Sequence, residues 1–167
     1  MVRRLLTPAL LLNFAAIAVA QDIPLQLQGK WVVQRVVPTT TISCWTYEEA
    51  RRLVGTEVVY TAYSLRWKDR VANHPLVAVS TVSAEQFHRE FSGGGTVDSQ
   101  VSFRQLGIQT PTATLIILTH PDAKPIWGAD EIPGDTVLIK DEGTVIFSVC
   151  NVYLEARRKP AKTGIQK

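Results

Sequence analysis

Short runs of branched and aromatic residues divide most of the chain into strands. The first, Gly29–Val37, reads Gly-Lys-Trp-Val-Val-Gln-Arg-Val-Val and is rich in the residue types that favour extended structure. The same pattern predicts strands at 56–62, 64–71, 76–82, 112–120, 125–132, 135–140 and 144–156. The chain is therefore predicted to hold about eight strands.

Between the strands, polar residues give the start signals of short helices. Thr46 is a predicted N-cap, and Glu49 stands three residues later as its capping-box partner. Ser83 and Gln86 repeat this pattern before a second helix, and a further helical turn is predicted over 101–106. Two or three short helices are thus expected in the connections.

Tight turns between short strands favour an antiparallel sheet, because parallel strands would need a long crossover at each connection. The first and last strands are apolar on both faces, as expected if they pair and close the sheet. The predicted fold is mainly β: an antiparallel up-and-down barrel of about eight strands, formed by one domain over residues 21–156.

The first 20 residues carry a different pattern. Arg3 and Arg4 precede an apolar run over 5–19, and Ala18-Val19-Ala20 provides a small-x-small cleavage site before Gln21. This arrangement predicts a secretory signal peptide over 1–20 that is removed from a secreted or periplasmic protein. Because the run is too short to cross a bilayer, we predict no stable membrane insertion after cleavage.

The net charge of the predicted domain differs from that of the whole chain, because the leader is basic. The whole chain has 18 basic and 15 acidic side chains, a net charge of +3, but Arg3 and Arg4 belong to the leader. Five further cations lie in 157–167, which we predict to be a flexible basic tail that extends into solvent or touches an anionic surface. The domain itself is mildly acidic, so nucleic acid is not a predicted partner.

The predicted export also bears on the redox state of the two cysteines. An even pair in an oxidising compartment predicts a disulfide between Cys44 and Cys150, which would close a long loop and contribute at most about 4 to 5 kcal/mol. The alternative is a pair of buried thiols. With no Cys-x-x-Cys spacing, the chain offers no redox motif and no thiolate metal site.

One predicted strand places a cation beside apolar residues. Trp31, Val33 and Arg35 share a face by simple alternation. If Trp31 points into the barrel, Arg35 lies near its mouth, where it would suit an amphiphile with an acidic head. The alternative is that Arg35 is solvated at the rim.

Aromatic residues gather in or near the connections: Trp45, Trp67 and Trp127, with Tyr47, Tyr60 and Tyr63. Such side chains can line a ligand entrance or a partner surface, and they can equally fill the single core of a small domain. We take Tyr60 and Trp67, together with Arg35, as candidate ligand-binding residues.

Catalytic and metal-binding patterns are weak. His74, His88 and His120 are widely separated and lack zinc-ligand spacing, so no metal or other cofactor is predicted. Glu85 lies one turn before His88, a spacing that a solvated helix face also produces. No Gly-x-Ser-x-Gly motif is present. Catalysis is unsupported, and the question of an enzyme stays open.

Gly29-Lys30-Trp31 resembles the Gly-x-Trp motif that opens lipocalin and other calycin barrels. The resemblance implies that Trp31 plugs the closed end and that an arginine after the last strand packs over it. Arg157 and Arg158 stand there, and we assign the role to Arg157. The chain departs from the lipocalin pattern because its helices come early and none follows the last strand.

The chain also resembles small exported bacterial proteins of unknown function, which share the tryptophan strand, a helix ending in Leu-x-Gly at 53–55, and a phenylalanine-bearing helix at Phe87. They also share a Leu-Gly-Ile turn at 106–108. We therefore expect an exported lipocalin-like protein that binds a small hydrophobic or amphipathic ligand non-covalently. The alternative is a protein-interaction module, such as an inhibitor of a secreted or envelope enzyme. A continuous interior cavity would favour the ligand, and a filled core with an aromatic patch would favour a protein partner.

Overall fold

The computed structural model describes residues 22–39, 45–90, 101–120, 132–149 and 151–160. The predicted leader, Cys44, Cys150, Trp127 and most of the predicted strand 125–132 lie outside these ranges. The described strands are β1 Gly29–Val37, β2 Glu57–Tyr60, β3 Ser64–Trp67, β4 Arg70–Asn73, β5 Leu76–Ser83, β6 Thr112–Thr119, β7 Thr136–Asp141, β8 Thr144–Val149 and β9 Val152–Arg158. The described helices are α1 Tyr47–Arg51, α2 Ala84–Glu90 and α3 Phe103–Leu106.

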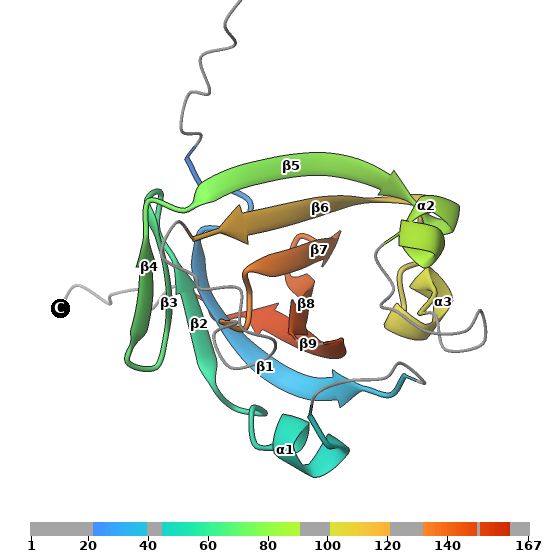
Figure 1. Ribbon diagram of the computed structural model, residues 1–167, viewed down its shortest axis with the longest axis horizontal. Coiled ribbons are helices and arrows are strands. Elements are labelled where there is room, and N and C mark those ends of the chain that lie inside the picture. The colour runs from blue at the N-terminus through green and yellow to red at the C-terminus, as the bar shows by residue number, and fades with distance from the viewer. Residues whose placement is uncertain (1–21, 40–44, 91–100, 121–131, 150, 161–167) are drawn as a thin grey trace, which may run out of the picture.

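All nine described strands belong to one antiparallel sheet, in the order β4-β3-β2-β1-β9-β8-β7-β6-β5, which curls into a half-barrel (Figure 1). The predicted pairing of the first and last strands is confirmed, since β1 lies beside β9. The mainly β, antiparallel fold is confirmed too.

Closure of the barrel is not confirmed, because β4 and β5 are the two edges of the sheet and do not pair. Only His74 and Pro75 connect them. His74 has a φ of 48° and Pro75 follows it, and the two strands leave this turn without pairing.

Two predicted strands are hairpins. The stretch 64–71 contains β3 and the start of β4, which reverse direction at Lys68 and Asp69, and Lys68 has a φ of 54°. Likewise 144–156 contains β8 and most of β9, with Val149 opposite Val152 and a φ of 60° at Asn151. Polar residues stand at both reversals, Lys68-Asp69 and Asn151, but neither turn contains a glycine or a proline.

The predicted helix starts are confirmed. The Thr46 hydroxyl accepts a hydrogen bond from the Glu49 backbone N–H, and the Glu49 carboxylate accepts one from the Thr46 N–H at 2.7 Å. At α2 the Ser83 hydroxyl accepts from the Gln86 N–H at 3.0 Å. These caps satisfy backbone donors that the first helical turn leaves free. None of the described helices is long and apolar enough to span a bilayer.

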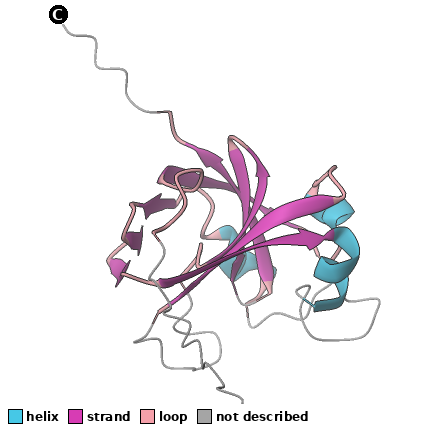
Figure 2. Cartoon of the chain, turned by 90° about the horizontal axis from the view of Figure 1, so that it is seen from above, coloured by secondary structure: helices cyan, strands magenta, loops and turns pink. Residues whose placement is uncertain are grey.

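Buried side chains form two clusters, one on each face of the sheet. The concave face holds the larger cluster, which includes Trp31, Tyr60 and Phe147. The opposite face is covered by α2 and α3, whose Phe87 and Phe103 pack against the sheet. Both helices stand together at one end of β5 and β6 (Figures 1 and 2). Strands β6 to β9 are therefore buried on both faces.

Candidate functional site

An arginine covers Trp31, and it is Arg158 instead of the predicted Arg157. Trp31 is fully buried, and its indole N–H donates to the Leu27 carbonyl at 2.7 Å. The Arg158 guanidinium lies 4.3 Å from the centre of the Trp31 ring and also donates to the Gln28 carbonyl. This contact is the cation–π geometry that the lipocalin resemblance implies.

Arg157 was the wrong choice because of the strand register. Arg158 lies opposite Trp31 and shares its face, whereas Arg157 lies opposite Val32 and faces outward. Both arginines are inside β9, and the Lys159 N–H continues the pairing by donating to the Lys30 carbonyl. The ordered sheet therefore extends beyond Ala156, into the region predicted as tail.

Arg35 does not face the interior. The β1–β9 register shifts between Val33 and Arg35, which leaves Gln34 as the extra residue of a β-bulge. A bulge reverses the alternation of faces, so Val36 joins the concave cluster and Arg35 turns to the opposite side. The predicted inward Arg35 is wrong for this reason.

On that opposite face, Arg35 belongs to an ion cluster. One oxygen of the Glu155 carboxylate accepts from the Arg35 guanidinium at 2.8 Å and from the Lys140 ammonium at 2.9 Å. Burial of Glu155 raises its pKa, but the two hydrogen bonds outweigh burial, so the pKa lies below its ordinary value. The cluster keeps a buried carboxylate charged and stabilises the packing of β1, β7 and β9.

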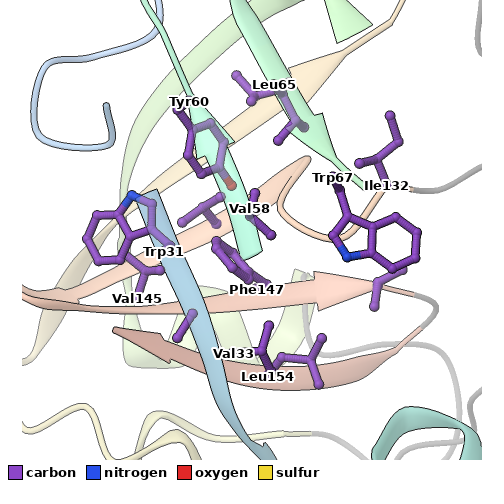
Figure 3. Close-up of a cluster of buried hydrophobic side chains, with 14 of the residues drawn as sticks. Trp31, Val33, Val58, Tyr60, Leu65, Trp67, Ile132, Val145, Phe147 and Leu154 are labelled. Atoms are coloured by element: carbon purple, nitrogen blue, oxygen red, sulfur yellow. The ribbon is translucent and has the colours of Figure 1, made fainter. Parts of the chain in front are cut away.

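Tyr60 and Trp67 point into the concave cluster and fill it (Figure 3). The Tyr60 hydroxyl donates to the Gly134 carbonyl at 2.6 Å. Burial is the main cause that raises the pKa of Tyr60 well above its ordinary value, and the nearby charge of Asp135 adds to it. The Trp67 indole N–H donates to the Thr56 hydroxyl at 3.3 Å. The described interior thus contains packed side chains, and both residues have structural partners.

The three histidines remain apart. His74 stacks on Tyr63 with ring centres 5.6 Å apart, and His88 Nδ1 lies 3.3 Å from the Val101 carbonyl. Both ring nitrogens of His120 are covered and lack a hydrogen-bond partner, and burial, then the charge of Arg70, lowers the pKa of this ring. Within the described ranges, no group of three or more potential metal ligands occurs.

A pocket of about 240 Å³ lies where β1 ends, between α1 and the start of β9. Its lining is mostly apolar or aromatic: Val36, Val37, Pro38, Thr39, Trp45, Tyr47, Ala50, Asn151 and Val152. Trp45 packs against the concave cluster, while the Tyr47 side chain is 54% exposed. The Arg51 guanidinium lies 6.0 Å from the centre of the Tyr47 ring, which places a cation beside the pocket.

None of the predicted ligand-binding residues lines this pocket. The aromatic pattern did point to it, since Trp45 and Tyr47 were among the candidate rim residues. Apart from Ala50 of α1, the remaining lining comes from the end of β1 and the residues just after it, and from Asn151 and Val152 at the start of β9. The register of the β1–β9 pairing brings these segments together, and single-sequence periodicity does not specify that register.

The antiparallel half-barrel is compatible with a barrel fold. Architecture alone does not define a family or an activity. Comparisons of this chain with protein-family models, curated proteins and solved structures gave no match.

Proposed function

We propose that the protein is an exported, lipocalin-like half-barrel that binds a small amphipathic molecule in the pocket beside α1. The observation that carries the proposal is the pocket itself, a concave site of about 240 Å³ with two aromatic side chains in its lining. Ligand sites are typically concave and mostly apolar, with a few polar groups that orient the ligand. This pocket has that composition.

The size and surroundings of the pocket narrow the ligand class. Its volume is just below the roughly 300 to 1,000 Å³ of typical ligand pockets, so a single ring system or a short acyl chain fits better than a large lipid. The Arg51 guanidinium beside Tyr47 favours an acidic head group at the open side. Apolar contact with Trp45 and Val36 would hold the body of the ligand.

Titration with medium-chain fatty acids and aromatic carboxylates should therefore change the tryptophan fluorescence, with Trp45 as the reporter. Tyr47→Ala should weaken the binding of any responding ligand about tenfold, because it removes one aromatic wall of the pocket. The measurement is the dissociation constant from fluorescence, checked by calorimetry.

Tyr63→Ala is a matched control. The Tyr63 side chain is 55% exposed, nearly the same as Tyr47, but it stacks on His74 and does not line the pocket. This control should leave the dissociation constant unchanged. Equal losses in the two variants, or no response to any compound in the panel, would remove the support for this site.

The alternative function, a protein-interaction module, has separate support in β5. This eight-residue edge strand contains no charged residue, and apart from Val82 its residues are half-buried or exposed. Natural edge strands are commonly protected by charges, prolines or short length, and β5 has none of these within its bounds. An extended segment of a partner protein can add to such an edge as a further strand.

An edge this open should also pair with itself at high protein concentration. Sedimentation should show reversible association of the wild type, and Val79→Lys should abolish it by placing a charge in the middle of β5. Val54→Lys is the control, since Val54 has similar exposure but lies in the turn between α1 and β2. If the wild type stays monomeric over the whole concentration range, β5 gives no support to the alternative.

The predicted disulfide between Cys44 and Cys150 falls outside the described residues. We also propose export, on the strength of the leader pattern in residues 1–20.

A further inference from the structure

The two halves of the sheet differ on their outer, convex side. Over β6 to β9 this side is covered by α2 and α3. Over β1 to β4, Val37 at the end of β1 is the one outward residue among those described that belongs to a buried cluster. An uncovered sheet face that carries a distinctive side-chain pattern is a candidate interaction surface.

The strand register aligns the outward side chains in two rows. The first row runs across five strands: Lys159, Lys30, Val59, Arg66 and Val71. The second row, one step along, contains Arg157, Val32 and Glu57. These eight residues are the basic face. They comprise four cations, three valines and one carboxylate.

The single carboxylate does not neutralise the basic face. Glu57 lies 3.7 Å from the Lys30 ammonium and 3.1 Å from that of Lys159, so two cations share it. Among the described residues, Arg66 and Arg157 make no ion pair, and both are exposed. Lys68 stands at the margin, where it lines a shallow depression with Arg66 and Glu57. Asp69 and Glu142 lie in the neighbouring turns.

Two cations of the predicted tail, Arg157 and Lys159, stand on this face of the folded sheet. The rest of the domain is correspondingly acidic, which gives the molecule one anion-attracting side.

The geometry points to an anionic phospholipid surface as the partner of the basic face. The rows span about 19 Å from β9 to β4 at the usual strand spacing, which suits an array of head groups better than one small anion. Val71 is 50% exposed between the cations and offers apolar contact at the lipid interface. No aromatic side chain stands in the two rows, so the face lacks the stacking platform of single-stranded nucleic acid sites.

This inference is independent of the ligand pocket, since the residues of the basic face do not line it. The test uses the chain from Gln21 onward, which contains every described residue but not the predicted leader. It should bind vesicles of phosphatidylglycerol and phosphatidylcholine, and not vesicles of phosphatidylcholine alone. Binding should fall steeply between about 0.1 and 1 M salt, where the Debye length shrinks from about 10 to 3 Å.

The double variant Arg66→Gln with Arg157→Gln should weaken vesicle binding roughly 25-fold, because each basic residue near an anionic membrane contributes about fivefold. The control variant, Arg89→Gln with Arg104→Gln, has the same net charge but changes exposed cations on α2 and α3. It should bind as the wild type does. Circular dichroism would verify that both variants are folded.

Equal binding by the two double variants would overturn the assignment of the face, and equal binding to neutral vesicles would overturn its electrostatic basis. If the protein binds soluble polyglutamate but not anionic vesicles, the partner of the basic face is an acidic polypeptide and not a membrane.

Discussion

Trp31→Ala should lower the free energy of unfolding by about 3 to 5 kcal/mol, the range for removing a large aromatic side chain from a core. Trp31 is fully buried, hydrogen-bonded to Leu27 and covered by Arg158, so the surrounding structure has little freedom to fill the cavity. Urea unfolding followed by circular dichroism would measure the loss without relying on the deleted chromophore.

The two adjacent arginines provide the control for the plug. Arg158→Gln should destabilise the protein by about 1 to 2 kcal/mol, because it removes the cation–π contact and the hydrogen bonds to backbone carbonyls. Arg157→Gln should be close to neutral, since this side chain is exposed and faces outward. The reverse order of effects would contradict the assignment of Arg158.

Gly134→Ala should destabilise the fold by about 3 kcal/mol. Gly134 has a φ of 98°, where an alanine costs about 1 to 2 kcal/mol, and an added Cβ would lie only 2.2 Å from the Tyr60 hydroxyl oxygen. Tyr60 is buried and its hydroxyl is bonded to the Gly134 carbonyl, so it has no free space to move into. Thermal and urea unfolding would measure the effect.

A substitution at a second glycine, Gly55, measures the cost of backbone strain without that of a steric conflict. Gly55 has a φ of 86°, but an added Cβ there meets no atom within 4 Å, so Gly55→Ala should cost only the backbone strain of about 1 to 2 kcal/mol. In the Gly134→Ala background, Tyr60→Phe should recover part of the loss by removing the conflicting oxygen. Strict additivity of the two changes would show that the hydroxyl and the Cβ do not compete.

Local chemistry in the sequence predicted the elements that depend on a few neighbouring residues. The Thr46 and Ser83 caps are confirmed, because a cap needs only one side chain and the backbone three residues later. The pairing of β1 with β9 is also confirmed, as the apolar character of both strands indicated. An arginine packs over Trp31, as the Gly-x-Trp resemblance implied, although it is Arg158 and not Arg157.

What failed depends on backbone irregularities that hydrophobic periodicity does not specify. One extra residue at Gln34 reverses the faces of β1 and turns Arg35 outward. Positive φ at Lys68 and Asn151 divides two predicted strands into hairpins, although neither position is a glycine. The pocket depends on both kinds of feature, since its lining joins the end of β1 to the start of β9.

Because its strands are unequally buried, the sheet should unfold locally at one edge before the other. Strands β8 and β9 are buried at nearly every position, whereas β2 to β4 are buried only at alternate positions. Segments with few buried apolar contacts exchange their amide protons through local opening well below the global unfolding free energy. The β2–β4 segment is therefore the weaker cooperative unit, able to peel from the β4 edge while β6 to β9 remain folded. Because it carries much of the basic face, contact with a planar surface there would stabilise the part of the sheet that opens most easily.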